Sequence, residues 1–358
     1  MSKHKFEPDY VVAPGATLKE SLDAQGISQV QFAQRTGLTK KTISQIINGI
    51  APISYETAGR FELATGIPAN FWNRRELRYR EALARRKTLA SLAHHDTWLK
   101  EIPLDVLMER GYVEPSNDTG TLVHRALRFF GVSSVDAWRK ALLTPAVQYR
   151  SSKAEAKYPG FVAAWLRMGE LQAEAIDCDK YNAEEFRRLL RNEIRELTTT
   201  SGQVWRKRLP ELCAQAGVVF VLTREIPRAA VSGAARWLLK REVPLIQISL
   251  KFKTDDQTWF SFYHEAGHVL LHGRRKLYVD YGKDDETEEE RQANVFARDL
   301  LIPPENVAEF PRLRRKAAIR RFAASIGVSP GIVVGRLQHD HYLEPKHCND
   351  LKKKYEWS

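Results

Sequence analysis

Residues 259–272 read WFSFYHEAGHVLLH. The apolar residues on both sides of the central polar group predict a buried helix over about 257–272. His264 and His268 are four residues apart, so on a helix they lie one above the other on the same face. Two imidazoles in this arrangement can bind one zinc ion, at about 2.0–2.1 Å from each ring nitrogen. Glu265 follows one residue further round the helix, where a general base for water at the metal is needed.

A second helix, predicted over about 286–301, offers a third ligand, and a catalytic zinc needs three from the protein. Three consecutive glutamates, residues 288–290, precede apolar residues that recur at helical spacing. We choose Glu290 among them because Asn294, four residues on, shares its face and is polar. The Asn294 amide can hydrogen-bond a ligand histidine. Alternatively, these acids only form a solvated helix start, which the helix dipole favours.

The segment before the two helices contains strand patterns. β-branched and aromatic residues predict strands at 218–222 and 245–250, and a shorter strand or hairpin arm at 229–239 around Gly233. The strand at 245–250 is either an edge strand that pairs with an extended substrate or an interior strand. A basic helical tail, with a small helical hairpin over about 319–337, is expected to pack on this domain.

The stretch from about 217 to 303 resembles the ImmA/IrrE family of metallopeptidases. The matching pieces are the strand at 245–250, the segment 259–272 and residues 290–303. The resemblance implies a gluzincin-like fold with two histidines and a later glutamate on zinc, and a catalytic glutamate after the first histidine. The resemblance assigns zinc binding to His264, His268 and Glu290. It assigns catalysis to Glu265.

Two details of this site stay open in the sequence. Related enzymes often carry an aspartate where this chain has Asn294, whose amide accepts a hydrogen bond but has no charge. An additional donor is expected to stabilise the oxyanion. His272, Tyr263 and Tyr278 are candidates that the sequence does not rank, and His272 can also be a structural histidine.

The N-terminal part contains a separate motif. Residues 28–49 read SQVQFAQRTGLTKKTISQIING. Ser28 and Thr39 are predicted N-caps of two short helices, Gly37 the turn between them, and Gly49 the end of the second. In a helix-turn-helix the N-terminal part of the second helix enters the major groove of DNA. The predicted DNA-binding residues are Gln29, Thr39, Lys40, Lys41, Ser44, Gln45 and Asn48.

Residues from Pro14 to about Arg86 resemble the HigA-type antitoxin branch of the Xre family. The resemblance implies a homodimer that binds double-stranded operator DNA, and a possible toxin partner. Phe71-Trp72, with a helix over 73–86, is then the face for the dimer or the partner. The alternative is that Phe71-Trp72 packs against the middle region of the chain. The segment 90–200 resembles the spacer that joins these two modules, and it contains no catalytic motif.

Charge and composition agree with this organisation. Residues 1–89 carry 14 Lys and Arg against 8 Asp and Glu, and residues 311–358 carry 11 against 4, so both ends are basic. Basic ends favour contact with a polyanion such as DNA. Three distant cysteines fit a reducing compartment, and residues 1–10 lack the apolar core of a signal peptide. We expect a cytoplasmic protein without a membrane span.

The sequence thus predicts a mostly helical α+β protein. Its regions are a helix-turn-helix domain at 1–89, a helical spacer at 90–200 with aromatic anchors, and a gluzincin-like metallopeptidase domain at 201–358. The favoured function is a DNA-binding transcriptional regulator with a Zn2+-dependent endopeptidase domain that cleaves a regulatory protein or itself. The alternative is a non-catalytic, antitoxin-like repressor whose zinc fold is structural or senses a ligand. A third possibility is a protease whose helix-turn-helix only dimerises it.

Overall fold

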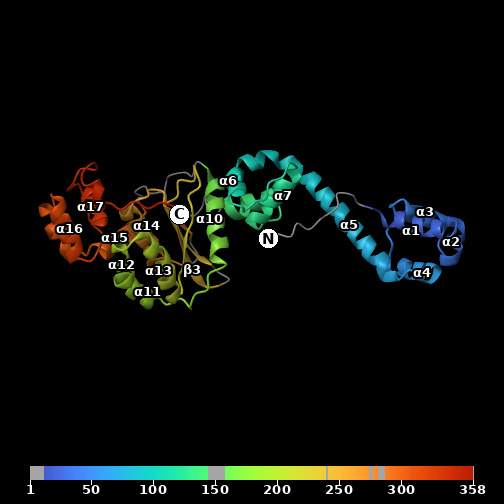
Figure 1. Ribbon diagram of the computed structural model, residues 1–358, viewed down its shortest axis with the longest axis horizontal. Helices are drawn as coiled ribbons and strands as arrows, with labels where there is room; N and C mark the ends of the chain where they lie inside the picture. Colours follow the sequence, from blue (N-terminus) through green and yellow to red (C-terminus); the bar gives the residue numbers. More distant parts are fainter. Residues whose placement is uncertain (1–11, 144–157, 239–240, 274–276, 281–286, 358) are drawn as a thin grey trace. The chain divides into compact units, whose positions relative to one another are not determined.

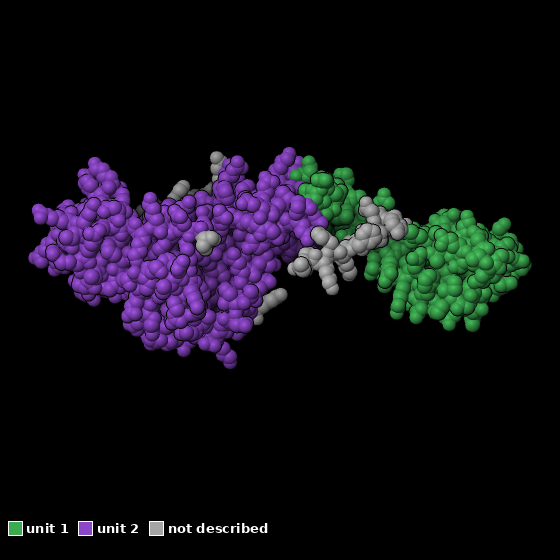
Figure 2. Space-filling model, viewed as in Figure 1, with its two compact units in different colours: residues 1–96, 116–124 green, residues 97–115, 125–358 purple. Residues whose placement is uncertain are grey.

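The computed structural model describes residues 12–143, 158–238, 241–273, 277–280 and 287–357. The chain divides into two compact units (Figure 2): unit 1, residues 1–96 with 116–124, and unit 2, residues 97–115 with 125–358. Residues 1–10, for which the sequence predicts no signal peptide, lie outside the described residues. The predicted fold class is confirmed, since helices dominate and the strands form one small mixed sheet. The division into regions at residues 89 and 200 stays a prediction.

Unit 1 is a bundle of helices (Figure 1). Five of its helices are α1 (Pro14–Ala24), α2 (Gln29–Thr36), α3 (Lys40–Ile47), α4 (Tyr55–Thr65) and α5 (Ala69–Leu92). Ser28 caps α2 by accepting a hydrogen bond from the backbone N–H of Gln31, and the Gln31 side chain accepts in return from the Ser28 N–H. Gly37 ends α2 in the left-handed conformation, at φ 66°, and Thr39 caps α3. The turn residues therefore have the roles that the sequence predicts.

Trp72 does not lie on a partner face, so this part of the prediction is wrong. The side chain is fully buried in the core of unit 1, and its ring lies 5.7 Å from that of Phe61 in an edge-on arrangement. α5 starts at Ala69, before Phe71-Trp72, whereas the sequence placed the helix start at residue 73. Trp72 therefore packs within the unit, and only Phe71, at 38% exposure, reaches the surface.

Unit 2 contains the longer part of the chain. α7 (Thr119–Phe130) and η1 (Ala93–Lys100) each cross the boundary between the units. The other helices are α6 (Leu104–Glu109), α8 (Val135–Trp138), η2 (Arg139–Leu143), α10 (Pro159–Ala173), α11 (Ala183–Arg191), α12 (Glu193–Glu196), η3 (Leu197–Thr199), α13 (Gly202–Gln215), α14 (Asp255–Leu271), α15 (Glu288–Leu301), η4 (Pro304–Arg312), α16 (Lys316–Ser325), α17 (Pro330–His339) and η5 (Asn349–Leu351). The predicted aromatic anchors Trp98, Phe129, Phe130, Trp138 and Trp165 are all buried.

A four-stranded mixed sheet lies in unit 2, with the strand order β1-β3-β2-β4. Its strands are β1 (Val219–Leu222), β2 (Gly233–Leu238), β3 (Val243–Ile248) and β4 (Tyr278–Asp280). β3 pairs with β1 in parallel and with β2 antiparallel, so it is an interior strand. This finding overturns the edge-strand alternative for residues 245–250. Within the described residues, β4 is the edge strand next to β2, and the sequence did not predict it.

Helices cover both faces of the sheet. α10 packs on one face, where Gln247 of β3 donates a hydrogen bond to the Trp165 carbonyl at 2.7 Å. α14 packs on the other face, against β2 and β3, and also contacts α15 and α17. Because both sides of α14 are covered, most of its residues from Asp255 to Val269 are buried. This burial explains why the segment is apolar around its polar group.

No single helix of the described residues is long and apolar enough to span a bilayer. α16 and α17 satisfy the two conditions only when they are joined, and the pair is bent by 112°. Their apolar side chains, among them Ile319, Phe322 and Val333, are buried in the core of unit 2. The predicted helical hairpin in the tail is thus part of this core.

Candidate metal centre and DNA-binding face

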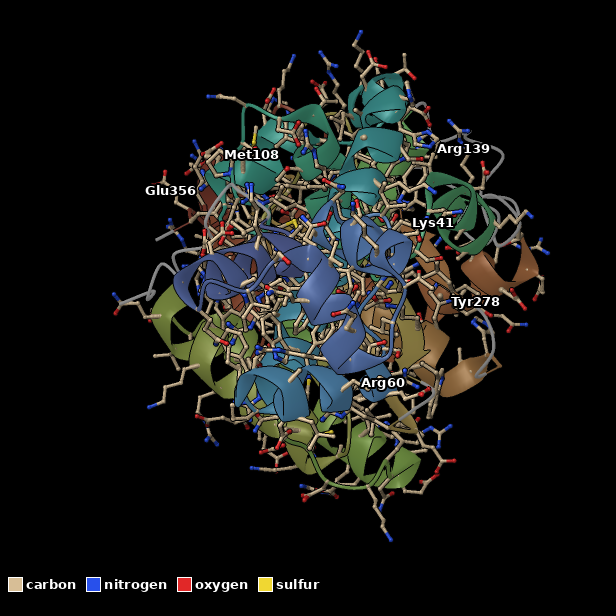
Figure 3. The ribbon with its side chains drawn as sticks, turned by 90° about the vertical axis from the view of Figure 1, so that its right-hand side faces the viewer. Lys41, Arg60, Met108, Arg139, Tyr278 and Glu356 are labelled. Atoms are coloured by element: carbon tan, nitrogen blue, oxygen red, sulfur yellow. The ribbon has the colours of Figure 1, made fainter. Side chains whose placement is uncertain are left out.

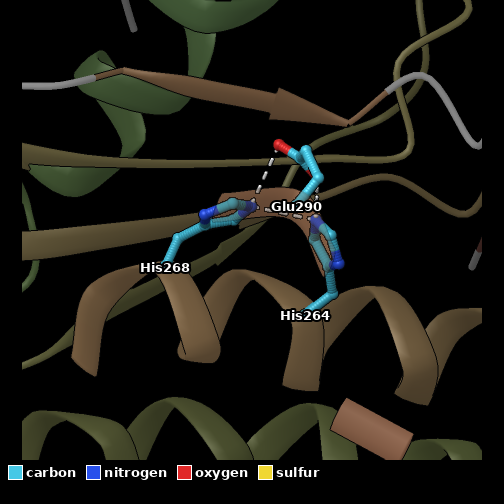
Figure 4. A group of neighbouring side chains, drawn as sticks. All are labelled: His264, His268 and Glu290. Carbon is cyan, nitrogen blue, oxygen red and sulfur yellow. Dashed lines mark hydrogen bonds and ion pairs between the residues drawn. The ribbon is translucent and has the colours of Figure 1, made fainter. Parts of the chain in front are cut away.

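Two helices bring three potential metal ligands together. His264 and His268 lie on the same face of α14, and Glu290 belongs to the first turn of α15, which Thr287 caps (Figure 4). α15 can approach α14 closely because Gly267 has no side chain. A Cβ atom at Gly267 would lie 3.2 Å from the Cα of Ala293. The small residue in this helix therefore sets the distance between the two ligand-bearing elements.

The three side chains converge on one point. The Nε2 atoms of His264 and His268 are 3.0 Å apart, and they lie 2.9 Å and 3.3 Å from the two carboxylate oxygens of Glu290. All three side chains are buried. Two ligand atoms on a tetrahedral zinc with bonds of 2.0–2.1 Å would be about 3.3 Å apart. The ligand atoms are therefore already close to the spacing that a metal ion requires, and the group can bind a metal.

The pKa shifts of His268 and Glu290 suit a cation, whereas the shift of His264 opposes one. Burial lowers the pKa of His268 to about 4, although its hydrogen bond with Glu290 opposes this shift. Burial acts against ionisation of Glu290 too, but hydrogen bonds with both histidines hold its pKa far below the ordinary value. Burial likewise opposes a proton on His264, but the hydrogen bond with Glu290 and the charge of Asp280 together raise its pKa. A metal would displace that proton from His264.

Each ligand histidine has a partner for its other ring nitrogen. Nδ1 of His264 lies 2.8 Å from Oδ1 of Asn294, which agrees with the position predicted for this amide. Nδ1 of His268 lies 2.9 Å from Nδ1 of His272. The ring of Tyr278 stacks on the ring of His268, with the ring centroids 4.0 Å apart and an interplanar angle of 13°. The two imidazoles are therefore held from several directions before a metal enters.

Glu265 is fully buried beside this group. Neither of its carboxylate oxygens has a hydrogen-bond partner within the described residues. Burial, followed by the negative charges of Asp280 and Glu290, raises its pKa well above the ordinary value. Its carboxylate faces Gly233 of β2, where a Cβ atom would lie only 2.7 Å from Oε1 of Glu265. An unpaired buried carboxyl group is costly for the fold, so this geometry fits a group that acts on a molecule bound at the three ligand side chains.

The predicted DNA-contact residues lie along α3 and at the start of α2. Lys40, Lys41 and Asn48 are exposed, whereas Ile43 and Ile46 face the core (Figure 3, where Lys41 is labelled). Ser44, Gln45 and Gln29 are half-buried. Thr39 caps α3 through a hydrogen bond from the Thr42 N–H, at 3.1 Å. α3 therefore presents a polar, basic face to solvent.

Two family models match the chain. The model of a peptidase family described as the IrrE N-terminal-like domain matches residues 221–338. A helix-turn-helix model matches residues 18–72. The chain is thus similar to an IrrE N-terminal-like domain in its C-terminal part and to a helix-turn-helix domain in its N-terminal part. A search among curated proteins gave no match.

These matches confirm the predicted combination of two modules. The IrrE N-terminal-like domain includes β2, β3 and all residues of the candidate metal centre, and it is a peptidase-type domain. The helix-turn-helix domain includes α2 and α3 and supports binding to DNA by a regulator. Zinc, the catalytic role of Glu265 and the individual DNA contacts stay predictions.

The structure separates the three candidate oxyanion donors in the IrrE N-terminal-like domain. The Tyr263 hydroxyl is buried and donates a hydrogen bond to the Leu190 carbonyl at 2.8 Å, so it points into the core and not to the metal centre. This excludes Tyr263. Tyr278 and His272 both lie beside His268, and both ring nitrogens of His272 are engaged.

Two residues at this site were missed in the sequence. Gly233 was noted only as the centre of a strand, and Gln292 only as part of a helix. Gly233 faces Glu265 from a strand far away in the sequence, which no local pattern reveals. Gln292 accepts from His272 across the two helices, at 3.2 Å.

Proposed function

We propose that this protein is a cytoplasmic DNA-binding regulator whose IrrE N-terminal-like domain is a zinc-dependent endopeptidase of the gluzincin type. The observation that carries the proposal is the convergence of His264, His268 and Glu290 next to the buried, unpaired carboxylate of Glu265. A zinc ion held by these three side chains would supply a Lewis acid that acidifies water and polarises a peptide carbonyl. The remaining steps fall to residues of the chain.

Glu265 acts as the general base in this proposal. Its carboxyl group is buried, faces Gly233 and has no hydrogen-bond partner within the described residues, so it is placed to take a proton at the site. It takes a proton from the attacking water and passes it to the amine of the leaving peptide. Asn294 orients His264 by accepting the hydrogen of Nδ1, since the ligating nitrogen is Nε2. Tyr278 is the remaining candidate for a donor to the oxyanion.

The substrate in this proposal is a regulatory protein, or the chain itself. The helix-turn-helix domain would bring the peptidase to an operator, where a bound repressor is the nearest protein. The test is incubation of the zinc-loaded protein with regulatory proteins encoded beside its gene, followed by mass spectrometry of the products. A defined cut by the zinc-loaded protein and none after chelation supports the proposal. Zinc uptake without cleavage of any neighbour would favour the non-catalytic repressor instead.

Gly233→Ala should lower the cleavage rate at least tenfold while zinc binding is kept. The added methyl group would overlap with Glu265, whose carboxylate must then move, and misplacement by about 1 Å can cost about a hundredfold in rate. Rates and zinc content would be measured together on the same samples. Ala234→Ser is the matched control, because Ala234 is buried next to Gly233 in β2 but belongs to the opposite face of the strand. An unchanged rate in Gly233→Ala would contradict this view of the strand.

Lys41→Ala should weaken DNA binding to all sequences alike. We expect the slope of log K against log salt to fall by about 1, because one phosphate contact is lost. Gln45→Ala should instead cost about 1–3 kcal/mol at a single base pair, since glutamine can read adenine in the major groove. Titrations at several salt concentrations, with operator and with random DNA, separate the two effects. Equal losses in both variants on random DNA would argue against Gln45 as a base contact.

A further inference from the structure

A chain of hydrogen bonds leads from the candidate metal ligand His268 to the surface. Nδ1 of His268 lies 2.9 Å from Nδ1 of His272, and Nε2 of His272 lies 3.2 Å from Oε1 of Gln292. Nε2 of Gln292 donates to Oε1 of Glu288 at 3.0 Å. His268 is buried, His272 is half-buried, and Gln292 and the Glu288 side chain are exposed. These hydrogen bonds thus connect the interior of the site with solvent. They run through two side chains of α14 and its C-terminal cap, and then through two side chains of α15.

The positions of the hydrogens follow from chemistry. Nε2 of His268 faces Nε2 of His264 and a carboxylate oxygen of Glu290, so Nε2 is the nitrogen that can hold a metal. A ligating nitrogen carries no hydrogen, so the neutral ring of His268 has its hydrogen on Nδ1. Two ring nitrogens 2.9 Å apart share one hydrogen, which makes Nδ1 of His272 the acceptor.

The next hydrogen bond joins His272 to Gln292. With Nδ1 as an acceptor, the neutral His272 ring carries its hydrogen on Nε2. That hydrogen is directed at Oε1 of Gln292, which can only accept. The amide nitrogen of Gln292 is then left to donate, and it lies next to the carboxylate of Glu288. Every donor in the chain has an acceptor, so the arrangement is compatible with one tautomer at each ring.

We propose that His272 is a positioning residue for the metal centre. It holds the tautomer and the ring angle of His268 through Nδ1, and Gln292 orients His272 in turn. This inference rests on the proposed metal site but not on cleavage. The arrangement parallels that of His264, whose Nδ1 lies against Asn294 of the same helix α15. α15 would therefore orient both ligand histidines, one directly and one through His272, besides contributing Glu290.

The packing around the two rings supports this role over that of an oxyanion donor. His272 follows the last residue of α14, four residues after His268, so the two rings lie on the same face. The Tyr278 ring stacks on His268 and lies 5.4 Å from the His272 ring. Because Gln292 and His268 take both nitrogens of His272, no hydrogen of this ring is left for a substrate.

The experiment compares two substitutions of similar size. His272→Asn keeps an acceptor near the place of Nδ1, whereas His272→Leu removes it. The zinc dissociation constant of each full-length variant would be measured by competition with a chromophoric chelator. We expect zinc affinity to fall about ten- to a hundredfold in His272→Leu, and clearly less in His272→Asn. Leu271→Ala, at an exposed neighbouring position, controls for disturbance of the helix end and should leave the affinity unchanged.

A second readout separates orientation from stability. Nitrogen-15 NMR of the zinc-loaded protein reports which ring nitrogen of His268 carries hydrogen. Wild type should show it on Nδ1, and His272→Leu should broaden or shift this signal while the melting temperature of the metal-free protein stays the same. Equal zinc affinity and an unchanged His268 signal in His272→Leu would overturn the inference. If wild type takes up zinc but cleaves nothing, only the peptidase proposal falls, because both readouts concern binding.

Discussion

Glu265→Gln should lose cleavage almost completely while the protein keeps its zinc. The substitution keeps the shape of the side chain but removes the ability to take a proton. General-base catalysis typically contributes about a hundred- to ten-thousandfold to a rate, so we expect a loss in that range. The ligands His264, His268 and Glu290 are untouched, which leaves about one zinc per chain as the expected metal content.

This experiment depends on the buried position of Glu265. In the metal-free protein its carboxylate is unpaired and its pKa is raised, so a neutral glutamine should not destabilise the fold. Initial rates and metal content would be measured on wild type and variant in parallel, with a melting curve for each. Glu309→Gln, an exposed acid on η4 outside the hydrogen-bond network of the site, serves as the control for the loss of a charge. Retention of more than a tenth of the wild-type rate in Glu265→Gln would assign proton transfer to another group.

Removal of zinc should be the second large effect, this time on stability. A ligand that binds only the folded state stabilises it by about 4 kcal/mol when its concentration is a thousand times its dissociation constant. The metal ligands sit on α14 and α15, whose apolar residues belong to the core of unit 2. We therefore expect a chelator to lower the free energy of unfolding of unit 2 by about this amount.

Urea unfolding with and without zinc would measure this difference. The fluorescence of tryptophans in the core of unit 2, such as Trp205 and Trp259, would report the unfolding. Glu290→Gln, which lacks the third ligand, should gain little from zinc. DNA binding by the helix-turn-helix domain provides an independent check that unit 1 is intact after chelation. A midpoint that does not respond to zinc in wild type would argue against a metal at His264 and His268.

The three predicted metal ligands converge in the structure because the elements that place them are local. The spacing of His264 and His268 places both on one helix face, and the choice of Glu290 over its two neighbours followed from its polar partner Asn294. Both placements agree with the structure. The helix-turn-helix was equally local, since capping residues and the glycine in the turn define it. The spacing of His268 and His272 held the same kind of signal, although the sequence left His272 open as an oxyanion donor or a structural histidine.

The errors concern contacts between distant segments. Whether residues 245–250 form an edge or an interior strand depends on how four strands are ordered, and the short strand β4 left no pattern of its own. Tyr263 is adjacent to His264 in the sequence, but neighbouring residues on a helix point about 100° apart. Its hydroxyl consequently reaches α11 in the core. Trp72 was placed on a partner face because no local feature of the sequence shows which residues it packs against.

The place of β4 at the edge of the sheet has a consequence for what the proposed peptidase can cleave. Within the described residues β4 pairs with β2 alone, and a further chain can pair with an edge strand only when it is stretched out over several residues. Helices and the interior strands of a folded target cannot take that shape without unravelling. The choice of target would then depend less on the sequence around the cleavage site than on how easily one loop of the target unfolds. If the proposed peptidase activity holds, a tightly folded neighbour would resist cleavage, and a ligand that unfolds a loop of a repressor would make that repressor easier to cleave.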